Sequence, residues 1–162
     1  MIEWYSNKNV GIFFDNIPKI MVREFHYDCE ISKEENKSKR KNIEQYPFEL
    51  TNEVFVTIKD YKTKEKYEFL IPKNYCYDGA SIPKTFIRLI GASTDNRFLI
   101  ASMVHDVLCE NHSYINFNRK LSTEVFNALL EASEVCAFKR FLMKYSVDFY
   151  QGFCGWKKGN KK

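Results

Sequence analysis

The apolar pattern of this chain changes once, between residues 75 and 83, and this change limits the fold more than any other feature. Upstream of it, short segments rich in β-branched and aromatic residues are separated by turn-forming residues, which is typical of β-strands. Downstream of it, apolar residues recur every three or four positions, which is typical of helix faces. Strands followed by helices predict an α+β fold, with an N-terminal antiparallel sheet or meander followed by a bundle of three to four helices.

The strands are expected in two groups. Two or three short strands are predicted within residues 1–31, and a meander is predicted from the β-rich segments Phe48–Leu50, Val54–Ile58 and Tyr67–Ile71. Between the two groups, residues 32–42 are highly charged and show no apolar periodicity. A mobile loop is therefore expected there.

Four helices are predicted in the second half of the chain. Ser81 is a natural N-cap and Pro83 is tolerated in a first helical turn, so a short helix is expected from Ser81 to Gly91. The other three are expected over about residues 93–108, 118–133 and 137–153, with a loop at 111–116 after the first of them.

A chain of 162 residues is expected to form a single domain. Within it, residues 1–50 would supply the N-terminal strands, residues 50–156 the core and residues 157–162 a basic tail. No apolar run is long enough to span a bilayer, and the N-terminus has no secretory signal pattern. The protein is therefore expected in the cytoplasm, with no membrane partner.

The cysteines predict reduced thiols rather than a disulfide framework. There are five of them, an odd number, and no two stand in a C-x-x-C pair. We expect most of them to be buried and chemically inert. They are Cys29, Cys76, Cys109, Cys136 and Cys154.

The net charge of +4 is modest, and much of the basic excess lies in residues 33–41 and 157–162. Such runs could neutralise phosphates of a nucleic acid. Acidic residues dilute the first run, however, and neither run has interleaved aromatic residues on which bases could stack. Solvated surface is the preferred interpretation of both.

The residues that could carry chemistry gather around the change of pattern. Asp78 precedes Gly79, a residue that allows close approach of the backbone to a ligand, and it is expected within reach of His105. Such a contact would orient the imidazole as a general base or raise its pKa. Asp78, His105 and Asp106 are the candidate catalytic residues. An equally weighted interpretation makes Asp78 a turn residue and Ser81 a helix cap.

His105 and Asp106 are adjacent, so on a helix they point about 100° apart. We expect no direct bond between them, although both could reach one site. His-Asp dipeptides bind metal in many phosphohydrolases, which makes both residues candidate ligands of a divalent metal ion. His105, Cys109 and His112 also share a helical face suited to zinc, but a capping histidine and an inert cysteine are preferred there. Walker A, dinucleotide-binding and nucleophile-elbow motifs are absent from the sequence.

Taken together, these motifs resemble the phage and bacterial family called domain of unknown function 1353. The resemblance covers about residues 50–156 and depends on Y-E-F-L-I-P at 67–72, Y-x-Y-D-G-A-S-I-P at 75–83 and A-S-M-V-H-D-V-L at 101–108. It implies that Asp78, Ser81, His105 and Asp106 are the recurrent polar residues, with Ser81 and Tyr77 as candidate binding residues.

Two positions depart from the family pattern. The family tends to have an aromatic residue where this chain has Cys109, and an acidic residue where it has Thr123, although Glu124 is adjacent. A phage origin would place the protein in the host cell cytosol. It would also suit an N-terminal addition of about 50 residues that binds a host or phage protein.

Two functional hypotheses therefore stay open. In the first, the chain is a small, metal-assisted hydrolase whose site contains Asp78, His105 and Asp106. In the second, it is a non-enzymatic phage-encoded binding protein, for instance an inhibitor of a host defence complex. The polar motif would then be purely structural, and an exposed apolar or basic patch is expected elsewhere.

Overall fold

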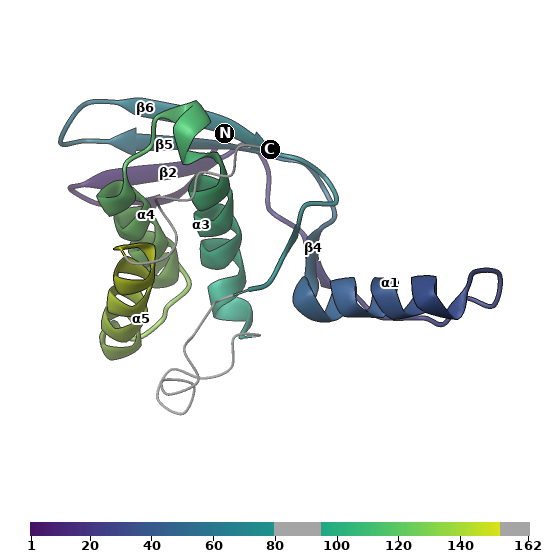
Figure 1. The fold of residues 1–162 in the computed structure, drawn as a ribbon. Helices are drawn as coiled ribbons and strands as arrows, with labels where there is room; N and C mark the ends of the chain where they lie inside the picture. Colours follow the sequence, from purple (N-terminus) through teal and green to yellow (C-terminus); the bar gives the residue numbers. More distant parts are fainter. Residues whose placement is uncertain (80–94, 153–162) are drawn as a thin grey trace.

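The computed structural model describes residues 1–79 and 95–152 (Figure 1). The short helix predicted from Ser81 to Gly91 lies outside the described residues, as does the basic tail at 157–162. The remaining architecture is an antiparallel sheet followed by helices, so the predicted α+β class is confirmed.

The larger sheet has four antiparallel strands in the order β1-β2-β5-β6. Their bounds are Ile2–Ser6 for β1, Val10–Phe14 for β2, Val54–Asp60 for β5 and Lys66–Ile71 for β6. Alternation along β5 places Val54, Val56 and Ile58 on one face, and all three are fully buried. One face of this sheet is therefore the floor of the core.

A smaller sheet joins the N-terminal segment to the end of the meander. It contains β3 (Ile20–Val22), β4 (Phe48–Leu50) and β7 (Cys76–Tyr77), paired antiparallel in that order. The backbone N–H of Leu50 also donates to the carbonyl of Tyr75 at 3.0 Å. This pairing fixes where the chain leaves the sheets, immediately before Asp78.

Three helices lie over the buried face of the larger sheet, two of them in contact with the sheet and the third packed on one of these two (Figure 1). They are α3 (Asn96–Ile115), α4 (Arg119–Ala132) and α5 (Ala137–Tyr150). Helix α4 packs on β1 and β2, α3 packs on β6, and α5 packs on α4. Within the described ranges, no helix is long and apolar enough to cross a membrane.

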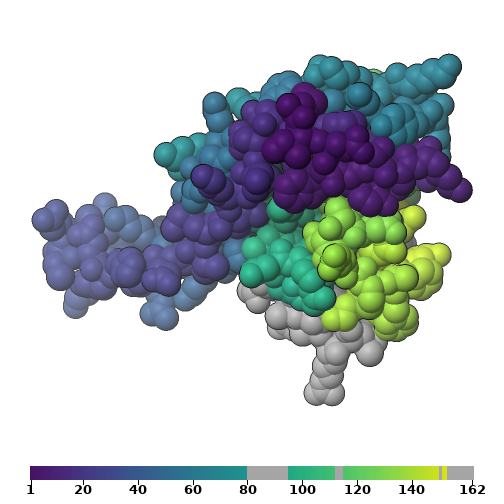
Figure 2. Space-filling view, turned by 180° about the vertical axis from the view of Figure 1, so that it is seen from behind, coloured from purple at the N-terminus to yellow at the C-terminus, as the bar shows by residue number. Residues whose placement is uncertain are grey.

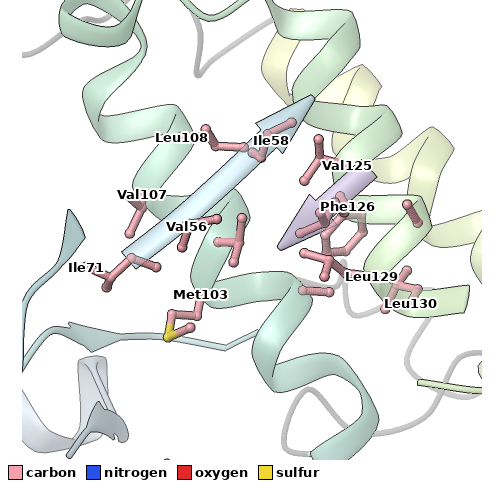
Figure 3. Close-up of a cluster of buried hydrophobic side chains, with 14 of the residues drawn as sticks. Val56, Ile58, Ile71, Met103, Val107, Leu108, Val125, Phe126, Leu129 and Leu130 are labelled. Carbon is pink, nitrogen blue, oxygen red and sulfur yellow. The ribbon is translucent and has the colours of Figure 1, made fainter. Parts of the chain in front are cut away.

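The core is formed by side chains from the sheet, α3 and α4 (Figure 3). Its members are aliphatic or aromatic and almost completely inaccessible to solvent. They include Val56, Ile58, Ile71, Met103, Val107, Leu108, Val125, Phe126, Leu129 and Leu130. Their close packing sets the position of α3, the helix that carries His105 and Asp106.

The charged segment at 32–42 is not a loop, contrary to the sequence prediction. It belongs to α1 (Lys33–Gln45), which projects away from the sheets and the other helices (Figures 1 and 2). A capping box begins the helix, because Ser32 accepts from the backbone N–H of Glu35 while the Glu35 carboxylate accepts from that of Ser32. Buried Asn36 then ties the helix to Asp28. These local hydrogen bonds, rather than an apolar stripe packed on the core, hold the helix in place.

Two further predictions need correction. Helix α3 continues to Ile115, where a loop was expected at 111–116, and the chain turns only at Asn116, whose φ is 49°. The described cysteines are not buried: Cys29 and Cys136 are exposed, and Cys76 and Cys109 are partly exposed. Cys154 lies outside the described residues.

We predict that Leu129→Ala lowers the free energy of unfolding by about 2–5 kcal/mol, because Leu129 is completely buried and its truncation leaves a cavity. Leu70→Ala is the matched control, since Leu70 is 51% exposed, and it should change stability by less than about 0.5 kcal/mol. Urea unfolding followed by circular dichroism measures both. Equal effects of the two substitutions would contradict the described core.

Candidate functional site

The candidate site begins where β7 ends. Tyr77 is 1% exposed and its ring packs on Phe48, with 5.6 Å between ring centroids, which holds the end of the strand in place. Asp78 follows on the surface, and Gly79 has a φ of 82°, a conformation that favours glycine. The end of β7 therefore places the Asp78 carboxyl group beside α3, where it hydrogen-bonds to Asp106.

Asp106, on α3, is the partner of Asp78. The two carboxyl groups hydrogen-bond to each other, and burial, the largest cause, raises the pKa of Asp106 well above its usual value of 3.8. The nearby Asp78 and Glu110 charges raise it further. Two ionised carboxylates cannot hydrogen-bond, so Asp106 holds the proton and donates it to Asp78. Its side chain keeps 27% exposure, which leaves it accessible from solvent.

A third acid and two tyrosines complete this side of the site. Glu110 lies one helical turn beyond Asp106, and the Tyr75 hydroxyl donates to its carboxylate at 3.0 Å. The rings of Tyr75 and Tyr77 stack with 6.2 Å between centroids. Burial raises the pKa of both phenols, and the Asp106 charge raises it further. The phenols therefore stay protonated, and the buried Tyr77 hydroxyl has no hydrogen-bond partner among residues 1–79 and 95–152.

His105 lies close to Asp106, within ion-pair range but too far for a hydrogen bond, which is closer than expected for side chains that point about 100° apart. The Nδ1 atom of His105 lies 3.7 Å from an oxygen of Asp106. On its other side, Nε2 lies 2.7 Å from the amide nitrogen of Gln151. That amide nitrogen can only donate, which assigns the acceptor role to Nε2 and the ring proton to Nδ1, the nitrogen that faces Asp106.

Gln151 is the centre of a polar network that the sequence interpretation missed. Its amide nitrogen also lies 3.1 Å from the Cys109 sulfur and 3.1 Å from the Ser122 hydroxyl, while its carbonyl oxygen accepts from Thr123 at 3.3 Å. Cys109 in turn lies 3.5 Å from Nε2 of His105. These partners are up to 46 residues apart in the sequence, so no local pattern could reveal them.

Asp106 therefore joins two arrangements, the carboxyl pair with Asp78 and the imidazole network behind it. The expected meeting of the strand-end carboxylate with α3 occurs, but its partner is Asp106 rather than His105. Thr123, one of the two departures from the family pattern, belongs to the buried network. Glu124 instead forms a surface ion pair with Lys62 at 3.0 Å and takes no part in the site.

Two predicted features find no counterpart in the described residues. Ser81 lies outside them, as does the side chain of His112, so their roles as binding residue and zinc ligand stay predictions. Within residues 1–79 and 95–152, no group of three or more His, Cys, Asp or Glu side chains is arranged to hold a metal ion. The described geometry is that of two hydrogen-bonded carboxyl groups beside an imidazole.

The proton on Asp106 predicts a specific dependence of stability on pH. The folded state holds this proton more tightly than the unfolded chain, in which the pKa is about 3.8. The contribution of Asp106 to stability is therefore full below about pH 4 and is lost as the pH rises through its raised pKa, at about 1.4 kcal/mol per pKa unit. Asp106→Asn stays neutral at every pH, so the variant should lose less stability than the wild type over this range.

Urea unfolding of both proteins between pH 4 and pH 9 measures this difference. Glu3→Gln, which neutralises an exposed carboxylate on β1, is the control and should keep the wild-type dependence. Parallel curves for the wild type and Asp106→Asn would show that Asp106 does not bind a proton more tightly in the folded state.

Comparison with known proteins places this site within a shared domain. The model of the family described as "Protein of unknown function (DUF1353)" matches residues 54–147, more than half of the chain. The uncharacterized protein y4jT of Sinorhizobium fredii (strain NBRC 101917 / NGR234) is 44% identical over 43 residues, which is 26% of this chain and 13% of y4jT. No solved structure matches. Residues 54–147 contain Asp78, His105, Asp106 and Glu110, and the chain belongs to the DUF1353 family.

Proposed function

We propose that the chain is a small hydrolase in which Asp78 and Asp106 act as a general base and a general acid. The observation that carries the proposal is the hydrogen bond between the exposed carboxyl group of Asp78 and the partly buried one of Asp106, whose pKa burial raises well above its usual value. Titratable groups whose environments push their pKa values apart are characteristic of acid–base sites.

The proposed reaction needs one proton transfer at each carboxyl group. The Asp78 carboxylate accepts a proton from a water molecule as the water oxygen attacks the electrophilic atom of the substrate. Asp106 donates its proton to the leaving group as the scissile bond breaks, and proton transfer from Asp78 back to Asp106 restores the starting state. The Nδ1–H of His105 faces the charge that develops on Asp106 and stabilises it.

Metal assistance is the other form of this proposal. Carboxylate oxygens and imidazole nitrogens are ligands of divalent cations, and Asp106 and His105 supply both kinds within 3.7 Å of each other. A bound cation would favour the ionised form of Asp106. The metal-assisted form therefore predicts that added metal favours loss of the Asp106 proton, whereas the metal-free form predicts no effect of metal, so activity assays should include both conditions.

A second candidate function is favoured by the outer surface. Helix α1 projects from the rest of the molecule (Figure 2), and α5 exposes large aromatic side chains. Both features are typical of proteins that bind other proteins. In this form the chain is a phage-encoded binding protein, such as an inhibitor of a host defence complex. When this protein is expressed in bacteria that restrict a phage, the plating efficiency of that phage should then rise. The Asp106→Asn variant should have the same effect.

For the hydrolase, we predict that Asp78→Asn and Asp106→Asn each lower kcat/KM by about 10²–10⁴-fold, the usual contribution of a general acid or base. The full chain is assayed against panels of ester, phosphoester, glycoside and peptide substrates. Each panel is measured with EDTA and with Mg²⁺, Mn²⁺ or Zn²⁺, between pH 4 and pH 9. Asp78→Asn should remove the base and leave the fold intact, because Asp78 is exposed.

Glu3→Gln is the control and should keep full activity. Circular dichroism and thermal unfolding show whether each variant is folded. Activity that survives both Asn substitutions in folded protein would refute the proposed acid–base roles. Activity that appears only with added metal, and is lost in His105→Ala, would favour the metal-assisted form.

A further inference from the structure

Helix α5 has two apolar faces, and only one of them belongs to the core. Met143 is 2% exposed and faces α4. The other face holds Phe138, Phe141 and Tyr145, which are 61%, 55% and 61% exposed. These residues stand at i, i+3 and i+7, so they form one stripe along the helix, and Met143 points away from it. We call these three residues the aromatic stripe.

The aromatic stripe is held rigidly. Arg119 of α4 binds the Asp148 carboxylate at 2.8 Å, and Arg140 of α5 binds Glu131 of α4 at 2.7 Å. The first ion pair lies beside the stripe, because Asp148 stands one turn beyond Tyr145, and the second lies on a different side of α5. Phe141 and Tyr145 lie against each other, with 4.4 Å between ring centroids. The stripe is therefore a preformed surface, which reduces the entropy lost on binding.

From this surface we infer that the chain forms a dimer in which the aromatic stripes of two copies pack antiparallel. A two-fold axis that crosses the stripe at the level of position 143, midway between Phe141 and Tyr145, places Phe141 of each copy opposite the partner's Tyr145. The stripe is thus complementary to itself, as a two-fold interface requires. The rings can then meet edge to face or with offset stacking, the arrangements that aromatic pairs prefer.

The exposed area fits a weak dimer. A Phe or Tyr side chain buries roughly 150–250 Å², so three rings that are a little over half exposed offer roughly 350 Å² per copy. Phe149, 69% exposed on the same face, brings the total for two copies to about 1,000 Å². This is the lower limit for a specific interface. A dissociation constant of micromolar order is therefore expected.

The charges at the edges of the stripe allow this pairing. Lys144 and Lys139 lie on its two sides, about 90° and about 130° around the helix from its centre. Their aliphatic stems can cover the rim of the interface while the ammonium groups stay in water. An acidic partner helix could also contact these lysines, and the experiment separates this outcome from a second copy.

Analytical ultracentrifugation of the full chain tests the inference. The mass should rise from 19.3 kDa toward twice that value as the concentration increases to about 100 µM. Phe141→Glu and Tyr145→Glu should each shift the midpoint of this rise at least tenfold upward. Leu70→Glu is the matched control, because Leu70 is 51% exposed on β6, and it should leave the midpoint unchanged.

Circular dichroism confirms that each variant is folded. A monomer at every concentration would overturn the inference, as would a dimer that survives both substitutions in α5. The chain could instead stay monomeric and bind a synthetic acidic amphipathic helix, with this binding lost in Phe141→Glu. That result would assign the stripe to a partner protein and would also overturn the inference of a dimer.

Discussion

The candidate site depends on how α3 packs between the larger sheet and α4. Phe98, Met103, Val104 and Leu108 are completely buried in this contact. Burial at about 25 cal/mol per Å² of apolar surface makes it one of the main sources of folding free energy in the domain. The rotation of α3 about its axis is fixed as a consequence. The side chain of Asp106 therefore points toward Asp78, the residue that follows β7.

The position of Asp106 beside two other acidic side chains has an electrostatic cost. The site holds Asp78, Asp106 and Glu110 within interaction distance of one another, and the imidazole of His105 lies 3.7 Å from Asp106. The arrangement lowers its charge by keeping a proton on Asp106. Such strain is typical of functional sites, where polar groups are placed for chemistry rather than for stability. A purely structural contact would be satisfied equally well by neutral side chains.

Much of the fold could be predicted because it is specified locally. The β-rich segments identified β5 and β6 as a hairpin, although β4, which was predicted to continue the same meander, pairs with β3 and β7 instead. Asn118 caps α4 close to the predicted start of that helix. Helix α1 was missed because apolar periodicity was the criterion, whereas Ser32 and Glu35, both visible in the sequence, form its capping box. Both faces of α5 are apolar, so the sequence could not show which one is exposed.

The site was predicted in outline and missed in detail. Proximity of Asp78 to α3 followed from its place at the end of the strands. The contact between His105 and Asp106 did not, because Cβ atoms that point 100° apart still allow the ends of two side chains to approach. Gln151 could not be found at all, since its position beside His105 depends on the packing of α5 against α4.

In the structure described above, Asp106 holds a proton and donates it to Asp78. Carbon-13 NMR titration of the aspartate side-chain carboxyl groups, in the wild type and in Asp78→Asn, tests this. We expect Asp106 to titrate well above 3.8 in the wild type and at a lower pH in Asp78→Asn, because the charge of Asp78 is gone. An Asp106 carboxyl that titrates near 3.8 in both proteins would contradict it.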